Sequence, residues 1–147
     1  MYLGIIVSGI AWLASQGTKL IIKSGRKRIS WKDVLSYSDM PSSHTATVIG
    51  LATYIGLAEG TSSPIFATAI ILAVIVITDA IGLRNYLGQH GKTLNVLVKD
   101  LKEDDFLDNR YPKQLEHIGH TPLQVLIGGL IGILVAIFTF LIAKAIG

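Results

Sequence analysis

The sequence predicts an all-α integral membrane protein: a compact bundle of about four transmembrane helices with one amphipathic interfacial helix. Half of the 147 residues are hydrophobic and only 16% are charged, whereas soluble domains of this size carry about 25% charge. The hydrophobic residues are also gathered into long runs, as membrane-crossing helices of about 20 residues require. The length favours a single domain over residues 1–147.

Four segments are expected to cross the bilayer as helices, because open strands would leave backbone groups unpaired in lipid. They cover about residues 2–22, 44–58, 64–83 and 122–144. The second segment is short, and it requires burial against its neighbours or a locally thinner bilayer. Residues 59–63 form a tight turn, so the second and third helices make an antiparallel hairpin.

Two polar loops, 23–43 and 85–121, connect the other helices. In the second loop, apolar residues recur at helical spacing with charged residues between them, at Leu94, Leu97, Val98 and Leu101. This pattern predicts an amphipathic helix over about 93–103. The helix either lies in the membrane interface or covers a soluble loop.

The basic residues predict the orientation of the bundle. Twelve of the thirteen Lys and Arg residues fall in or beside the two polar loops, and only Lys144 falls at the opposite side. The positive-inside rule then places these loops in the cytoplasm and both termini outside, with the chain in the cytoplasmic membrane. Because topology explains the net charge of +3, we expect no nucleic-acid partner.

Two glycine pairs, Gly56–Gly60 and Gly128–Gly132, have the four-residue spacing that lets helices approach closely. We expect this spacing to serve packing within the bundle. A homodimer contact is the alternative use.

Polar residues stand at the cytoplasmic end of every predicted helix. Two of these ends are helix N-termini, whose free N–H groups and positive dipole ends favour an anion. Thr121 is the predicted N-cap of the last helix, with Pro122 at its first position. Lys19 and Arg84 add two positive charges. A phosphate dianion is therefore the expected ligand.

His44 and His120 have the chemistry to react with a bound phosphate, as nucleophile and general acid near neutral pH. Phosphoryl transfer otherwise needs positioning and stabilisation of charge on the phosphate oxygens. The acids at 103–105 are consecutive and point apart on a helix, so no metal site is expected. No other cofactor is expected, and the absence of cysteine excludes thiolate chemistry.

Four motifs occur in order along residues 15–132: Gln16-x-x-Lys19, Met40-Pro-Ser-Ser-His44-Thr-Ala, Asp79-x-x-Gly82-x-Arg84-x-x-x-Gly88-Gln89, and Gly119-His-Thr-Pro-x-Gln124-Val-x-x-Gly128. Together they resemble the type 2 phosphatidic acid phosphatase superfamily, and more closely its divergent bacterial and plant branch. The resemblance implies a metal-independent phosphatase that works through a phosphohistidine. Its substrate would be a lipid phosphomonoester or diphosphate, such as phosphatidate, phosphatidylglycerol phosphate or polyprenyl diphosphate.

The resemblance also implies roles for individual residues. His44 would protonate the leaving oxygen, and Ser43 replaces the glycine of the superfamily's Pro-Ser-Gly-His motif. Lys19 and Arg26 have the spacing of the first motif. The phosphate-binding residues would be Lys19, Arg26, Ser42, Ser43 and Arg84.

Two histidines compete for the role of nucleophile in this resemblance. Arg84 and His90 have the superfamily spacing, but Leu94 replaces the expected aspartate. In the divergent branch the Gly-His-Thr-Pro histidine is the better equivalent, so His120 is assigned as nucleophile and His90 is the alternative. Gln124, where an acid is often found, would orient the imidazole, and Asp79 would stabilise its charged form.

Two other functions fit the same residues. One is a non-catalytic lipid-phosphate binding or scaffold protein in the membrane. The other is a vanadate-dependent haloperoxidase, although such enzymes are larger and water-soluble.

Overall fold

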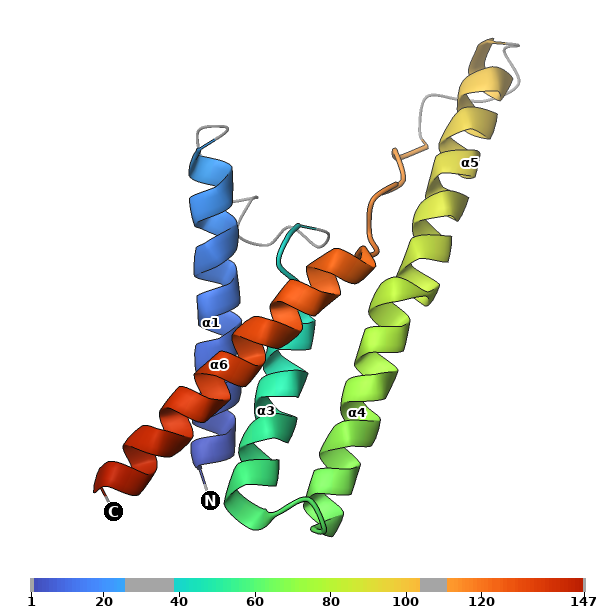
Figure 1. Ribbon diagram of the computed structural model, residues 1–147. Helices are drawn as coiled ribbons and strands as arrows, with labels where there is room; N and C mark the ends of the chain where they lie inside the picture. The colour runs from blue at the N-terminus through green and yellow to red at the C-terminus, as the bar shows by residue number, and fades with distance from the viewer. Residues whose placement is uncertain (1, 26–38, 104–110, 147) are drawn as a thin grey trace.

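The computed structural model describes residues 2–25, 39–103 and 111–146, and all regular secondary structure in these ranges is α-helical. Figure 1 shows the helices as a bundle from which one long arm extends. The helices are α1 (Leu3–Ser24), α3 (Ser43–Glu59), α4 (Pro64–Ile81), α5 (Leu83–Glu103) and α6 (Pro122–Ile146). The predicted all-α fold is confirmed.

In the described part of the chain, three helical stretches are long and apolar enough to cross a membrane: Leu3–Ser24, Pro64–Leu101 and Pro122–Ile146. The predicted short span is α3, which has 17 residues and is therefore about 25 Å long. It packs against α1, α4 and α6, so its neighbours bury it as its length requires.

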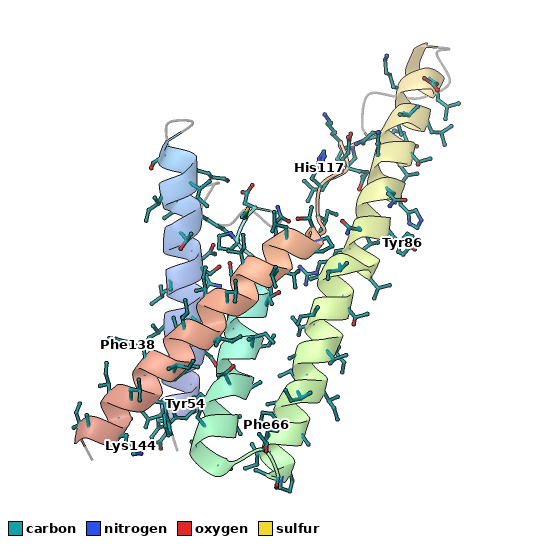
Figure 2. All side chains as sticks on the ribbon, viewed as in Figure 1. Tyr54, Phe66, Tyr86, His117, Phe138 and Lys144 are labelled. Atoms are coloured by element: carbon teal, nitrogen blue, oxygen red, sulfur yellow. The ribbon has the colours of Figure 1, made fainter. Side chains whose placement is uncertain are left out.

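The core of the bundle is built from small side chains. Among the residues that the structure describes, the buried hydrophobic ones are alanine or valine: Val7, Ala11, Ala46, Val48, Ala52, Ala69, Ala73, Ala80, Val125 and Ala136. The large apolar side chains point outward, as Figure 2 illustrates for Phe138, which is 67% exposed. Small residues inside and large ones outside are typical of helices that associate in lipid.

The most extensive helix contact joins α6 to α3, which α6 crosses diagonally in Figure 1. A side chain at Gly128 would collide with the backbone of Ser42, and one at Gly132 would collide with the backbone of Ala46. The spacing of these two glycines therefore serves packing within the chain, the first of the two uses that the sequence left open.

The hairpin of α3 and α4 has the predicted tight turn. Gly60 has a φ of 84°, a left-handed conformation that glycine adopts without strain. The Ser63 hydroxyl then accepts a hydrogen bond from the Ile65 N–H (3.2 Å) and caps α4. Pro64 follows at the first position of the helix, where its missing N–H has no cost.

Helix α5 is longer than the amphipathic helix expected over 93–103. It begins at Leu83, directly after a break at Gly82 (φ −94°, ψ −86°), and continues the direction of α4 in Figure 1. The first part of the expected loop 85–121 is therefore helical. The polar residues between Arg84 and His90 concealed this helix in the sequence. Where α5 lies relative to a bilayer stays a prediction.

Candidate active site

Six polar side chains are buried among the residues that the structure describes, and they lie where α3 and α6 begin and α1 ends. They are Ser15, Lys19, Ser42, Ser43, Thr45 and His120. Burial of polar groups is unfavourable unless they have partners or serve a ligand. The partners of each group therefore decide which of them are available to bind or react.

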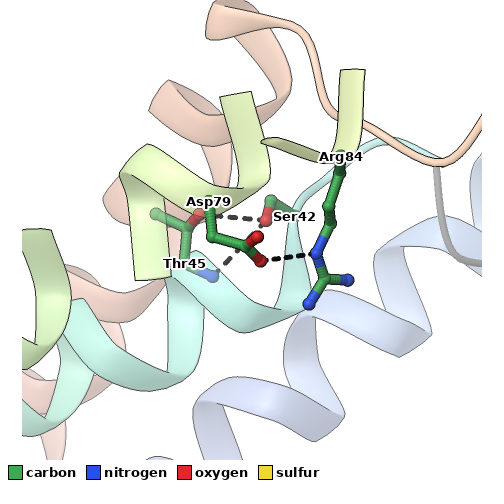
Figure 3. A network of polar contacts seen from close by, with 4 residues as sticks. All are labelled: Ser42, Thr45, Asp79 and Arg84. Atoms are coloured by element: carbon green, nitrogen blue, oxygen red, sulfur yellow. Dashed lines mark hydrogen bonds and ion pairs between the residues drawn. The ribbon is translucent and has the colours of Figure 1, made fainter. Parts of the chain in front are cut away.

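Two serines at the start of α3 differ in their hydrogen bonding. Ser42 is the N-cap, and its Oγ accepts hydrogen bonds from the Thr45 hydroxyl (2.9 Å) and the Thr45 N–H (3.4 Å), as Figure 3 shows. Ser43 is only 2% exposed, yet its Oγ has no hydrogen-bond partner in the described part of the chain. Of the two serines, Ser43 is therefore the one whose hydroxyl is available to a ligand.

The start of α6 forms a capping box. The Thr121 N–H donates to Gln124 Oε1 (2.8 Å), and the Gln124 N–H donates to Thr121 Oγ1 (3.3 Å). The predicted N-cap is confirmed. Gln124 was expected to orient the His120 imidazole, but neither ring nitrogen of His120 has a hydrogen-bond partner among the described residues. The structure does not bring Gln124 to the imidazole.

His120 lies directly before this cap and faces His44 across the site. Its side chain is 1% exposed, and its backbone N–H donates to the Ala80 carbonyl (2.9 Å). The ring centroids of His44 and His120 are 6.4 Å apart with an interplanar angle of 76°. The two histidines that the sequence selected from distant segments are therefore neighbours.

Positive charge surrounds the histidine pair. Lys19 is 4% exposed, and no salt bridge joins it to an acid within the described ranges. Burial of His120, followed by the charges of Lys19, His44 and Arg84, lowers the pKa of its imidazole from 6.5 to about 4. His120 is consequently neutral at pH 7, with the lone pair of one nitrogen available for bonding.

Asp79 and Arg84 form an ion pair on either side of Gly82. Arg84 Nε lies 2.6 Å from Asp79 Oδ2, and Figure 3 shows the pair beside the N-terminus of α3. Asp79 was expected to act on the imidazole of the nucleophile. Its carboxylate instead pairs with Arg84, and neither ring nitrogen of His120 has a hydrogen-bond partner in the described part of the chain.

One other predicted residue, His90, lies away from this cluster. His90 is exposed on α5, and its separation of six residues from Arg84 places it on a different face of the helix. Arg26 lies outside the described residues. Within residues 2–25, 39–103 and 111–146, no group of three acidic or histidine side chains is arranged to hold a metal ion.

Sequence reasoning missed Asn85. Its side-chain amide donates to the Ile81 carbonyl (2.6 Å) and to the His120 carbonyl (3.3 Å). The second contact joins residues 35 positions apart, so no local spacing could have indicated it.

These features define a membrane-embedded helical protein with a cationic, histidine-containing site at two helix N-termini. Residues 3–135 match the family described as the Divergent PAP2 family, and the chain belongs to that family. It is similar to the uncharacterized membrane protein YuiD of Bacillus subtilis (strain 168), with 36% identity over 120 residues that cover 76% of each chain. No solved structure matches it. The resemblance drawn from the four motifs is thus confirmed.

Proposed function

We propose that this protein is a metal-independent membrane phosphatase that hydrolyses a lipid phosphomonoester or diphosphate through a phosphohistidine intermediate. The observation that carries the proposal is the pairing of buried His120, whose ring nitrogens have no partner in the described chain, with His44 at 6.4 Å between centroids. A buried imidazole without hydrogen bonds is costly, and a reaction at that ring explains why it is kept.

In the proposed reaction a ring nitrogen of neutral His120 attacks the phosphorus, forming an N–P bond. The P–O bond to the lipid breaks, and His44 donates its proton to the leaving oxygen. Water then attacks the phosphohistidine and gives a proton to His44, which releases inorganic phosphate and restores both residues. Lys19, Arg84 and the Ser43 hydroxyl stabilise the negative charge on the phosphate oxygens.

The surroundings of the site favour a lipid over a soluble phosphate ester. Helices α1 and α4 both pack on α3 but do not contact each other within the described chain. His44, Leu51 and Ile55 lie on one face of α3 because of their spacing. A cavity of about 400 Å³ opens near the far end of that face; its lining is mostly apolar, including Leu51 and Ile55, and also contains Glu59. A hydrocarbon chain attached to a phosphate at His44 would extend toward this cavity.

The proposed orientation places the site in the cytoplasm and the chain in the cytoplasmic membrane. Figure 1 has both termini at the end of the bundle opposite the start of α6. Helix α1 ends, and α3 and α6 begin, at the other end, next in sequence to the basic loops, so the positive-inside rule assigns the site to the cytoplasm and both termini to the outside.

The test is phosphate release from lipid phosphates by purified protein with EDTA present. We expect turnover, inhibition by vanadate, and an acid-labile phosphate that maps to His120 after an alkaline quench. A strict requirement for an added divalent metal, or label on His90, would contradict this mechanism.

A second candidate function is non-catalytic binding of a lipid phosphate. It is favoured by one observation: Asp79 pairs with Arg84, and no carboxylate among the described residues is hydrogen-bonded to the His120 imidazole. For a binder, inorganic phosphate would protect the protein against heat while no lipid phosphate releases phosphate.

A further inference from the structure

At the break between α4 and α5, two backbone carbonyls accept hydrogen bonds from groups other than the N–H groups of a regular helix. At Gly82 the backbone leaves the helical conformation (φ −94°, ψ −86°). The Ala80 carbonyl accepts the His120 N–H (2.9 Å), and the Ile81 carbonyl accepts the Asn85 amide (2.6 Å). The interruption of the helix thus creates the surface on which the His120 backbone is held.

Asn85 joins the two sides of this contact. Its Nδ2 donates to the Ile81 carbonyl and also to the His120 carbonyl (3.3 Å). A side chain at Gly119 would collide with the Asn85 amide and would lie 2.7 Å from the Asn85 backbone nitrogen. Gly119 therefore leaves the space that Asn85 needs to reach the residue next to it.

Both polar groups of the His120 backbone are consequently fixed, one by Ala80 and the other by Asn85. Its imidazole, in contrast, has no hydrogen bond within the described chain. The orientation of the ring thus depends on the backbone to which it is attached and on packing.

We propose that Asn85 is a positioning residue, which holds the backbone of His120 so that the imidazole faces the phosphate site. This inference rests on the proposed function, because it gives the fixed imidazole a reaction to perform. Asn85 acts through His120 and does not touch the phosphate.

The experiment compares Asn85→Ala with Asn95→Ala in the full-length protein in detergent. Asn95 is a matched control, because its amide also ties α5 to the segment before α6, through the Gln114 backbone (2.8 and 2.9 Å). Misplacing a reacting group by about 1 Å costs about 100-fold in rate. We expect Asn85→Ala to lower kcat by about 10- to 100-fold with KM nearly unchanged, and Asn95→Ala to leave kcat within about twofold of the parent.

A second variant, Asn85→Asp, keeps the shape of the side chain and removes the donor. It is expected to lose at least as much kcat as Asn85→Ala, because a carboxylate would face two carbonyl oxygens. A second measurement does not depend on turnover. Diethyl pyrocarbonate acylates His120, and mass spectrometry gives the rate of this modification in the parent and in each variant, which reports whether Asn85 holds the His120 backbone. Release of the backbone should expose the ring, which is 1% exposed in the parent, and accelerate its modification.

Equal loss of kcat in the Asn85 and Asn95 variants would overturn the proposal in favour of general docking of this segment. A raised KM at constant kcat would also overturn it, since Asn85 would then contact the substrate. If the parent has no turnover, the proposed function fails. The acylation rates then still decide whether Asn85 holds His120, because unchanged rates in both Asn85 variants would show that it does not.

Discussion

The two ends of the bundle differ in what they bury. At the end where α3 and α6 begin, the structure buries Lys19, His120 and three hydroxyl side chains of α3, with Ser15 close by. At the other end, Glu59 and Lys144 are exposed, and Gly56 packs against the ring of Phe66. Buried polar groups lower stability unless they are satisfied, so one end of this small bundle gives up stability that the other end retains. A local loss of stability of this kind is expected at a site that binds a ligand or carries out a reaction.

The largest expected effect is at the nucleophile. His120→Ala should abolish turnover, a loss of about 1,000-fold or more, and should eliminate the acid-labile phosphate. Phosphate release from a lipid phosphate measures the first effect, and mapping of the label measures the second. His90→Ala, at an exposed position on α5, is the control and should keep parent activity. Activity that survives in His120→Ala would remove the site from this end of the bundle.

Loss of the general acid should come next. His44→Ala is expected to lower kcat by about 100- to 10,000-fold on a lipid phosphate. On an aryl phosphate the loss should be much smaller, because a phenolate leaves without needing a proton. The ratio of kcat values on the two substrates measures the role directly. Equal losses on both would assign His44 to phosphate binding.

Lys19→Met separates activity from stability. The variant removes the Lys19 charge, the second cause of the lowered pKa of His120, so that pKa should rise above about 4, while burial, the largest cause, still keeps it below 6.5. Protonated His120 cannot attack, and the acid limb of the kcat/KM profile should therefore move to higher pH by the same amount. We also expect kcat/KM at neutral pH to fall by about 10- to 100-fold.

Thermal unfolding in detergent measures the effect of Lys19→Met on stability. An apolar side chain in place of a buried charge should leave the Tm unchanged or higher. A Tm well below that of the parent would mean that Lys19 supports the fold. The contrast between the two ends would then lose its functional explanation.

The smallest expected effect concerns packing at the same end. Gly128→Ala places a methyl group against the Ser42 backbone and should reduce the free energy of unfolding by about 1–3 kcal/mol. Gly129→Ala is the matched control, because a side chain there makes only ordinary contacts with Thr45 and Ile49. Denaturation of both variants in detergent provides the comparison. Equal stability would show that α6 can move away from α3 without cost.

The sequence predicted the parts of the fold that depend on local patterns. Apolar runs located the spans, Gly60 and its neighbours located the hairpin turn, and Thr121-Pro122 located the start of α6. The start of α5 was missed because Arg84, Asn85, Gln89 and His90 place four polar residues in its first turns. That helix is held by the segment before α6, to which Asn95 binds, and so its stability comes from residues distant in sequence.

The sequence predicted which residues form the site better than it predicted the contacts between them. His44, His120 and Lys19 are gathered as expected, because their helices end on one side of the bundle. The partners of Asp79 and Gln124 could not be predicted, since each had a nearer partner, Arg84 or the Thr121 N–H, that competes with His120. Which partner such a residue binds depends on interatomic distances, and the sequence alone does not give these distances.

The shared location of the two termini has a practical consequence for experiments in cells. In the proposed topology, a reporter enzyme or fluorescent tag fused at either end stands in the same compartment, across the bilayer from the histidines. One such fusion therefore reports the side on which phosphate would be released, even before a substrate is known. It also leaves the start of α6 unobstructed, so that a tagged protein can be assayed directly.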